Sequence, residues 1–322
     1  MEALPGEAVA ELLRSHGTQP VTVERIPGSV VYRIELLGSR GDALPTSDDV
    51  AYVKLVGDAE LYRQLVAAND RSPGVGLPNS TVIESDGVAA LVSEPAAGRP
   101  LSRVLPVAFL PGVWLGLRHK LVDGYRAMGE YVGTLHRRLD TGNRPIDTEH
   151  LAGTDGIGQY LPTTTRDRIE SLYEDVLGRE VPTARIKSDL TPHNAFYTDG
   201  DVSLIDFSLK IRPRVRELAN LRVSLELMAR RLPYPAAGKA TRLADAFENG
   251  YELSITPRSD RSSLLAAFEI SYLCKILKNY LRSAPDASAG RWAFSMYDRR
   301  CVVNLLERKT QALETRSEGT RG

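Results

Sequence analysis

Residues 186–208 read IKSDLTPHNAFYTDGDVSLIDFS, and the fold of the chain is organised around this stretch. Asp199 and Gly200 stand between two apolar-rich runs. A two-residue hairpin turn needs positive φ angles, which Gly adopts without steric cost. The stretch therefore predicts a β-hairpin with its turn at these two residues. Counting back from the turn places Asp206 beside Asn194 at the open end of the hairpin.

Oxygen-bearing side chains gather at this open end. Asp189 lies just upstream of Asn194, on a loop that Pro192 stiffens. Two carboxylates and one carboxamide are thus expected to converge. Hard oxygen ligands of this kind suit Mg²⁺, which proteins usually hold through one or two side chains together with waters and substrate phosphates.

The spacing of these residues is similar to a known pattern. D-x-x-x-x-N from Asp189 to Asn194, followed by I-D-F around Asp206, resembles the catalytic and metal loops of protein kinase-like phosphotransferases. The residue sequence D-L-T-P-H-N most resembles the corresponding motif of the aminoglycoside phosphotransferase family. The resemblance implies that Asp189 is the catalytic base and that Asn194 and Asp206 hold Mg²⁺. The spacing alone also fits an ordinary surface hairpin with solvated acids, and upstream features favour the phosphotransferase interpretation.

A lysine on a short apolar strand is the first upstream feature. Val50–Val56 reads as a strand that contains Lys54, and a helix is expected over Asp58–Asn69 with Glu60 in its first turn. The resemblance implies that Lys54 binds the α- and β-phosphates of ATP and that Glu60 holds Lys54 in place. The alternative is a surface lysine and a glutamate favoured by the helix dipole.

Two further segments are candidates for nucleotide binding. Residues 27–29 form a turn between two expected strands, and Ser29 is the candidate phosphate neighbour there. Residues 94–100 carry no helix or strand pattern and are expected to form the hinge between two lobes. The resemblance implies that the backbone near Glu94 and Ala96 bonds the nucleotide base.

These elements predict an α+β protein with a protein kinase-like bilobal fold. A chain of 322 residues is too long for one compact core. Residues 1–97 are expected to form the nucleotide-binding lobe, a small antiparallel sheet of five strands with one packed helix. Residues 98–316 are expected to form a mostly helical catalytic and acceptor-binding lobe, and residues 317–322 a disordered tail.

Apolar spacing predicts most of the second lobe to be helical. A long helix ends near His136, for which a structural role is favoured over a chemical one. The apolar run Leu105–Leu117, interrupted by two prolines, is expected to be a buried helical connection. Helices are expected over Lys120–Leu139, Arg166–Leu177, Glu217–Arg231, Ala237–Glu252, Ser262–Leu281 and Met296–Thr315.

Composition excludes several classes of protein. The formal net charge is zero, which gives no case for nucleic-acid binding. No apolar run approaches the ~20 residues that a bilayer requires, so no membrane insertion is expected. The N-terminus shows no signal-peptide pattern, and Cys274 and Cys301 are expected to be buried thiols in a reducing compartment. These features predict a cytoplasmic protein.

Two residues depart from the family pattern. Related enzymes have His-Gly-Asp at the catalytic loop, whereas this chain has Lys187-Ser188-Asp189, and D-F-S ending at Ser208 replaces D-F-G. Lysine has three donors and no acceptor, so it cannot replace histidine like for like. Lys187 either pairs with a loop carboxylate and supports catalysis, or places its charge against the transferred phosphate. Alternatively, the loop belongs to a protein that binds nucleotide without turnover.

These patterns predict an ATP- and Mg²⁺-dependent phosphotransferase acting on a hydroxyl of a small molecule. Residues 207–322 contain 21 Lys and Arg against 12 Asp and Glu, a net charge of +9. If residues 212–216 are extended, Arg212, Arg214 and Arg216 point the same way. Such a basic surface favours a neutral or anionic acceptor, such as a sugar, a sugar phosphate, a nucleoside or a glycan. A nucleotide-binding pseudokinase and an aminoglycoside kinase are the alternatives.

Overall fold

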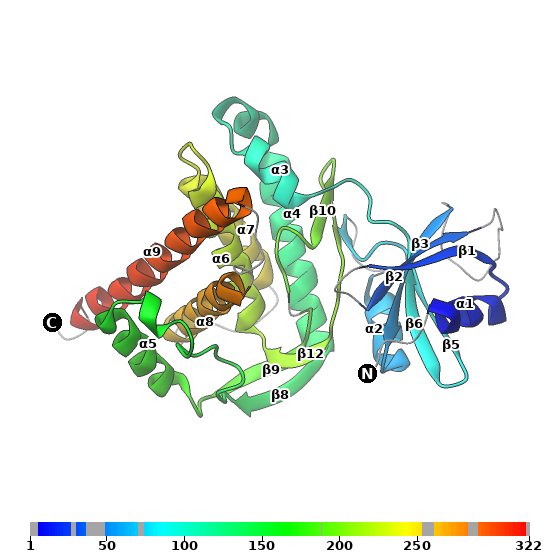
Figure 1. Ribbon diagram of the computed structural model, residues 1–322, viewed down its shortest axis with the longest axis horizontal. Coiled ribbons are helices and arrows are strands. Elements are labelled where there is room, and N and C mark those ends of the chain that lie inside the picture. The colour runs from blue at the N-terminus through cyan, green and yellow to red at the C-terminus, as the bar shows by residue number, and fades with distance from the viewer. Residues whose placement is uncertain are drawn as a thin grey trace. The chain divides into compact units, whose positions relative to one another are not determined.

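The computed structural model describes residues 6–26, 30–36, 49–69, 74–187, 189–252, 261–282 and 289–319 (Figure 1). The chain divides into two compact units. Met1–Arg99 and Phe196–Ile205 form the first, and Pro100–Ala195 and Asp206–Gly322 form the second. The boundary expected from the sequence lay between residues 97 and 98, and residues 196–205 were expected in the second lobe. Most of the hairpin that follows residues 187–194 thus belongs to the first unit.

A five-stranded antiparallel sheet forms the centre of the first unit, as predicted. Its strand order is β1 (Pro20–Arg25), β2 (Val31–Leu36), β3 (Val50–Val56), β6 (Val88–Ser93) and β5 (Ser80–Ser85). Period-two alternation buries one face of β2, and helix α1 (Gly6–Ser15) shares that hydrophobic core through Val9 and Leu13. The β5–β6 turn contains Asp86 and Gly87, both with positive φ.

Helix α2 (Ala59–Asn69) begins where the sequence predicts a helix. The Asp58 carboxylate accepts a hydrogen bond from the Leu61 N–H at 3.0 Å, which satisfies one free donor of the first turn. Leu61, Leu65 and Ala68 are buried on one face of the helix. The single packed helix expected over this segment is therefore confirmed.

The hairpin of residues 195–204 is also confirmed. Strands β10 (Ala195–Thr198) and β11 (Asp201–Leu204) are neighbours in a four-stranded sheet with the order β4 (Val75–Gly76), β11, β10 and β7 (Arg99–Pro100). Asp199 and Gly200 have φ angles of 48° and 113°. Both turn residues therefore occupy the positive-φ region that the two-residue turn requires.

The second unit contains a small antiparallel sheet that the sequence pattern did not predict. Its order is β12 (Lys210–Pro213), β9 (Glu180–Ile186) and β8 (Asp140–Pro145), and Lys210 lies opposite Ile186. The helices of the unit are α3 (Leu101–Ala108), α4 (Pro111–Arg138), α5 (Thr163–Val176), α6 (Val215–Arg231), α7 (Ala237–Glu252), α8 (Arg261–Arg282) and α9 (Ala289–Gly319).

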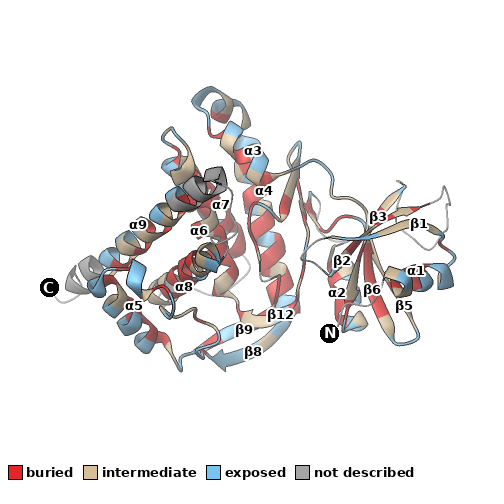
Figure 2. Cartoon of the chain, in the orientation of Figure 1, coloured by how far each residue is buried: buried red, intermediate tan, exposed pale blue. Residues whose placement is uncertain are grey.

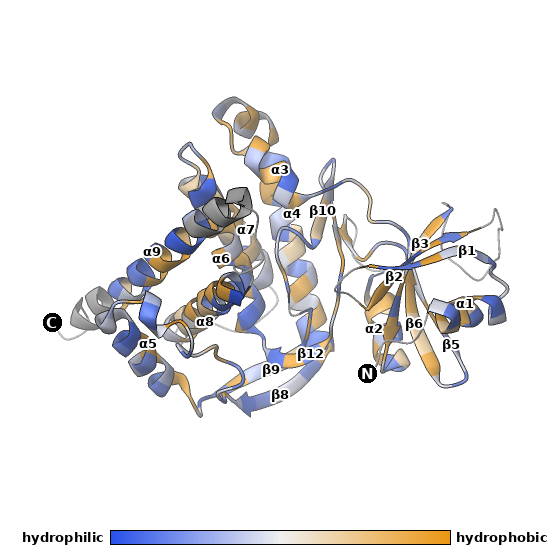
Figure 3. Ribbon diagram, viewed as in Figure 1, coloured by the Kyte–Doolittle hydropathy of each residue, from blue (hydrophilic) through white to orange (hydrophobic). Residues whose placement is uncertain are grey.

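Buried apolar residues line the helices of the second unit where these face one another (Figures 2 and 3). The core joins α5, α6, α8 and α9, and Ala219, Ile270 and Leu306 in it are fully buried. No helix in the described ranges combines the length and apolarity needed to cross a bilayer. Cys274 and Cys301 are free thiols, and Cys274 is buried.

Three expectations for the helices and the C-terminal tail are wrong in detail. The run Leu105–Leu117 is helical but only partly buried, because Val107, Leu110 and Leu115 are 56%, 40% and 72% exposed. Helix α4 starts at Pro111, nine residues before the expected start, since proline is well tolerated in a first turn. Helix α9 continues to Gly319, so the tail expected from residue 317 is helical up to that point.

Helices α4 and α7 approach closely through two glycines. A Cβ atom built on Gly129 would lie 2.0 Å from the Phe247 carbonyl oxygen. One built on Gly250 would lie 2.0 Å from the Arg126 carbonyl oxygen. Neither backbone carbonyl can rotate away as a side chain could, so any side chain at these positions must push the two helices apart.

We expect Gly129→Ala to lower the free energy of unfolding by about 3 kcal/mol through overpacking. Gly116→Ala on the same helix is the matched control, because no atom lies within 4 Å of its Cβ position. It should raise stability by up to about 1 kcal/mol through helix propensity. Equal denaturation midpoints for the two variants would contradict the close α4–α7 contact.

Candidate functional site

Pairing between β9 and β12 brings two loops of the second unit together. Residues 187–194 follow β9, and residues 206–209 precede β12. The Ser208 N–H and hydroxyl both donate to the Lys187 carbonyl oxygen, at 3.3 and 3.1 Å. The loop that carries Asp189 is therefore bonded directly to the loop that carries Asp206.

Lys187 supports the first loop from inside the protein. Its side chain is only 3% exposed, and its Nζ donates to the Asp189 carbonyl oxygen at 3.0 Å. The ammonium also lies 5.5 Å from the centre of the Phe207 ring, within the range of a cation–π interaction. This position favours the loop-supporting role over direct contact with a transferred phosphate, although the bond goes to a backbone carbonyl and not to the Asp189 carboxylate.

Asn194 fixes the Asp189 side chain. The Asn194 Nδ2 donates to Asp189 Oδ2 at 3.0 Å and to the Asp189 carbonyl oxygen at 3.1 Å. The Asn194 N–H itself donates to the Thr191 carbonyl oxygen, which closes a tight turn before β10. Because the amide nitrogen is turned toward Asp189, the amide oxygen is directed elsewhere and is the atom able to coordinate a cation. One oxygen of the Asp189 carboxylate, Oδ2, is thus held by Asn194.

Asp206 has an unusual backbone conformation. Its φ angle is 59°, in the left-handed region that non-glycine residues rarely adopt, and its side chain is exposed. Asp and Asn tolerate this region better than other side chains. Such outliers are frequent at functional sites, where the neighbouring structure holds the residue in place. Here the buried Phe207 and the bonds of Ser208 follow immediately.

Lys187 and Ser208, the two residues that depart from the resembled motif, are hydrogen-bonded partners. The Ser208 hydroxyl donates to the Lys187 carbonyl oxygen. No sequence pattern indicates this contact, because the two residues are 21 positions apart.

The predicted nucleotide-binding residues lie in the first unit. Lys54 is half-buried on β3, opposite Val31 of β2 and Leu91 of β6. Glu60 is exposed and forms an ion pair with Arg63 at 3.6 Å. Its assignment as the partner of Lys54 stays a prediction.

The phosphate-loop and hinge residues also stay predictions. Ser29 lies outside the described residues. Glu94 and Ala96 are half-buried and follow the end of β6. The Glu94 N–H donates to the Asn79 carbonyl oxygen at 2.9 Å, so a nucleotide base would have to use other backbone groups of this segment.

The donor set around Asp206 fits a magnesium ion that is completed by phosphates. In the described ranges no three His, Cys, Asp or Glu side chains converge on one point. The candidate ligands are the exposed Asp206 carboxylate and the Asn194 amide oxygen, both hard oxygen donors. Two protein ligands are typical for Mg²⁺ in sites where nucleotide phosphates and waters supply the rest.

His136 has the structural role that the sequence favoured. Its Nδ1 lies 2.7 Å from the Tyr251 hydroxyl and its Nε2 lies 2.7 Å from Glu217 Oε2, and all three residues are buried. The cluster links α4, α7 and the first turn of α6. Buried polar groups that satisfy one another in this way specify a single packing arrangement.

The basic residues after Asp206 do not share one direction, because β12 ends at Pro213 and α6 starts at Val215. Arg214 forms an ion pair with Asp140 at 2.6 Å. Arg216, in contrast, lines a cavity of about 150 Å³ within the second unit. The expectation that Arg212, Arg214 and Arg216 point the same way is therefore wrong.

This cavity lies within electrostatic reach of Asp189. Desolvation and a neighbouring arginine lower the pKa of both Arg216 and Lys275. The Asp189 carboxylate acts in the opposite direction on both groups. Burial and, to a smaller extent, Asp189 raise the pKa of Tyr272 to about 12. No pattern in the sequence connects Tyr272 and Lys275 with Asp189. Both lie on α8, more than 80 residues downstream of Asp189, and only tertiary packing brings them near it.

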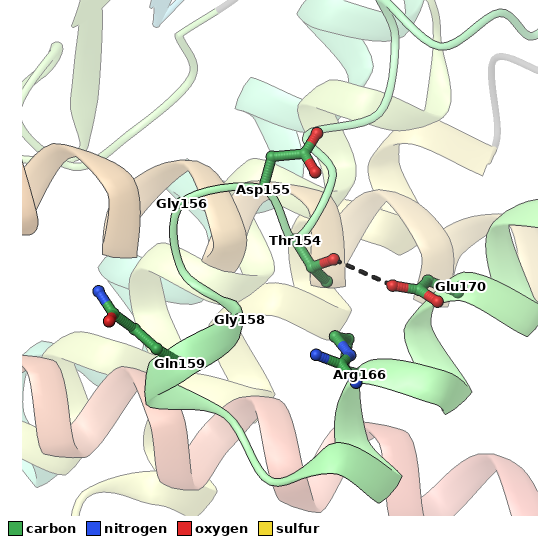
Figure 4. A pocket seen from close by; sticks show the side chains of 7 residues that line it. All are labelled: Thr154, Asp155, Gly156, Gly158, Gln159, Arg166 and Glu170. Carbon is green, nitrogen blue, oxygen red and sulfur yellow. Dashed lines mark hydrogen bonds between the residues drawn. The ribbon is translucent and has the colours of Figure 1, made fainter.

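A larger, open hollow lies beside the loop before α5. It has a volume of about 510 Å³ and is lined by polar residues, among which the Thr154 hydroxyl donates to Glu170 at 3.2 Å (Figure 4). Arg166 and Glu170 extend from α5 toward the loop of Thr154 and Asp155 in this view (Figure 4). None of the predicted site residues lines this hollow.

Comparison of the fold with solved structures gives clear matches. An amicoumacin kinase in complex with AMP-PNP, Ca²⁺ and amicoumacin superposes with a TM-score of 0.56 and 16% identity over 89% of each chain. A glucosamine kinase in complex with glucosamine, ADP and inorganic phosphate gives 0.58 and 15% identity, covering 99% of this chain and 89% of that one. The fold is that of the small-molecule kinases.

Sequence comparison adds nothing to this assignment. No protein-family model and no curated protein sequence matches the chain. At identities this low, the shared fold does not determine the substrate. The chemistry of this kinase-like chain must therefore be argued from its own residues.

We expect Lys187→Met to lower the turnover number about 10- to 100-fold by releasing the Asp189 loop. Lys187→Arg, which keeps the positive charge and hydrogen-bond donors, should lower it less. Lys278→Met, on α8, is the control for removing a lysine charge. Phosphate transfer at saturating ATP, together with thermal unfolding of each variant, provides the measurement. Equal turnover for all variants would show that Lys187 does not support the loop.

Asp206→Asn and Asp206→Ala separate charge from backbone conformation. Both should abolish the metal-dependent part of ATP affinity. Only the alanine variant should also lose stability, by about 1 kcal/mol, because alanine is strained at positive φ. Calorimetric titration of ATP with and without Mg²⁺ measures the first effect, and denaturant unfolding the second. Unchanged Mg²⁺-dependent affinity in Asp206→Asn would remove Asp206 from the metal site.

Proposed function

We propose that the protein is a kinase that transfers the γ-phosphate of ATP, with Mg²⁺, to a hydroxyl of a neutral or anionic small molecule. The observation that carries the proposal is the position of Asp189. Its carboxylate is held on one oxygen by Asn194, and its loop is braced by buried Lys187. A fixed carboxylate with one oxygen available can orient an acceptor hydroxyl and receive its proton.

Phosphoryl transfer mainly requires positioning and charge stabilisation. In the proposed reaction Asp189 orients the acceptor hydroxyl. Asn194 and Asp206 would hold Mg²⁺, which when bound neutralises charge on the β- and γ-phosphate oxygens. Lys54 would bind the nucleotide phosphates, with Glu60, Ser29 and the backbone of Glu94 and Ala96 as the remaining predicted nucleotide contacts. The kinase-like neighbours were crystallised with AMP-PNP and Ca²⁺ or with ADP, which supports a nucleotide donor.

The charge of the second unit supports a neutral or anionic acceptor. The cationic groups Arg216 and Lys275 lie within the electrostatic field of Asp189. A polycationic aminoglycoside would be repelled by them, whereas an uncharged or anionic compound would not. The aminoglycoside kinase therefore stays the less favoured substrate assignment.

A nucleotide-binding pseudokinase is the alternative from a different class, since Lys187 replaces the usual histidine. The contacts of Lys187 favour an active enzyme, because the buried lysine supports the Asp189 loop. The cytoplasmic location and the absence of nucleic-acid partners stay predictions from the sequence.

ATP consumption in the presence of candidate hydroxyl compounds tests the proposed function. Asp189→Asn should lower transfer by at least about 100-fold while leaving Mg²⁺·ATP affinity within about twofold. The same assay compares neutral sugars, sugar phosphates and kanamycin-type polyamines as acceptors. Near-normal transfer by Asp189→Asn would exclude Asp189 as the base. Saturable phosphorylation of the polyamines alone would contradict the proposed acceptor class.

A further inference from the structure

The cavity beside α6 and α8 contains cationic groups without counter-ions. Among the described residues, neither the Arg216 guanidinium nor the Lys275 ammonium has a carboxylate within 4.0 Å. Arg216 is half-buried in the first turn of α6, and Lys275 is exposed on α8. A half-buried guanidinium is normally paired, because removing its charge from water is costly. An anion in the cavity would supply a partner for Arg216.

The remaining walls of the cavity provide neutral hydrogen-bonding groups. His150, Asn220, Ser271 and Tyr272 carry such groups among the lining residues. The Ser271 hydroxyl accepts the Ala152 N–H at 2.7 Å, which anchors the loop after β8 to helix α8. The single carboxylate in the lining, Glu149, is exposed.

His150 adds a polar ring to the lining. Its Nδ1 lies 3.2 Å from both the backbone nitrogen and the carboxylate Oδ1 of Asp147. Burial lowers the pKa of His150, and Arg212 and Arg216 lower it further, against the opposing effects of Asp147 and Glu149. A neutral imidazole beside two cations avoids a third positive charge.

The electrostatics of the cations agree with this geometry. Burial, followed by the charge of Arg212, lowers the pKa of Arg216. The Lys275 side chain reaches solvent, but partial desolvation of its ammonium beside the cavity, followed by the charge of Arg216, lowers its pKa. Like charges have thus been brought together at one cavity, and a bound anion would relieve their repulsion.

The size of the cavity determines what could bind. A space of about 150 Å³ is smaller than the pockets that enclose whole drug-sized ligands. It has room for one substituent, such as a phosphate or a carboxylate. Asp189 is close enough to influence the charges of Arg216, Lys275 and Tyr272, so the rest of the ligand can extend toward the proposed catalytic base.

We propose that this cavity is an anion subsite, in which Arg216 and Lys275 bind a phosphate or carboxylate group of the acceptor. The inference rests on the proposed function and narrows it. The acceptor is then a hydroxyl compound with a negative charge, held by its anionic group while its hydroxyl lies at Asp189. Arg216 determines specificity, because its planar guanidinium suits bidentate capture of either anion.

Binding of inorganic phosphate without nucleotide tests the subsite independently of turnover. Calorimetric titration should give affinities about 10- to 100-fold lower for Arg216→Gln than for the unmodified protein, since a charged hydrogen-bonded contact is lost. Lys275→Gln should show a smaller loss. Lys278→Gln is the matched control, because it removes a lysine charge from the same helix without touching the cavity. Equal phosphate affinity in the unmodified protein and Arg216→Gln would overturn the proposal.

A transfer assay with matched acceptors distinguishes the source of the anion. Glucose, glucose 6-phosphate, glucuronate and glucosamine differ mainly in charge. The anionic compounds should have kcat/KM values at least about tenfold above those of the neutral sugar, and Arg216→Gln should remove this preference while Arg216→Lys keeps part of it. A higher kcat/KM for glucosamine than for the anionic compounds would contradict the subsite. So would an equal loss of kcat/KM on all four compounds in Arg216→Gln. Weakened Mg²⁺·ATP binding in Arg216→Gln would instead assign the cavity to nucleotide phosphate and also overturn it.

Failure of the proposed function gives a separate result. If no hydroxyl compound is phosphorylated but phosphate still binds in an Arg216-dependent way, the anion site is supported and the kinase assignment is contradicted. If transfer occurs without any preference for charge on the acceptor, the kinase assignment is supported and the anion subsite is contradicted.

Discussion

The burial of Lys187 is the interaction on which the candidate site depends. An ammonium group with 3% exposure must find its partners inside the protein, and here it bonds the Asp189 carbonyl oxygen and faces the Phe207 ring. Those two partners belong to the two loops that carry the proposed base and the proposed metal ligand. One buried charge thus fixes both loops, supported by the pairing of β9 with β12 and by the two bonds from Ser208.

Lys187 and Ser208 act together in joining the two loops. Lysine cannot accept a hydrogen bond, but its long side chain reaches the Asp189 carbonyl oxygen, and the Ser208 hydroxyl donates to the Lys187 carbonyl oxygen. Through these bonds the pair attaches the loop of Asp189 to the loop of Asp206.

Polar residues with structural roles surround the candidate site and limit what the remaining charges can do. His136, Glu217 and Tyr251 satisfy one another across three helices, and Arg214 is paired with Asp140. Arg214 and Glu217 are therefore engaged by partners within the second unit. Arg216 and Lys275 are different, since they line a cavity and have no carboxylate partner among the described residues. We therefore assign a structural role to the paired Arg214, and a proposed substrate-binding role to Arg216 and Lys275.

The sequence by itself determined the antiparallel sheet, helix α2, the Asp199-Gly200 hairpin and the gathering of Asp189 and Asn194, because turn chemistry and periodicity act over a few residues. It could not reveal the sheet of β8, β9 and β12, the bond between Ser208 and Lys187, or the cavity of Arg216, Tyr272 and Lys275. Those features join segments that are 20 to more than 100 residues apart. Only packing of the helices and strands decides which distant charges meet, so only tertiary structure showed that Arg214 is paired with Asp140 and that Arg216 and Lys275 line one cavity.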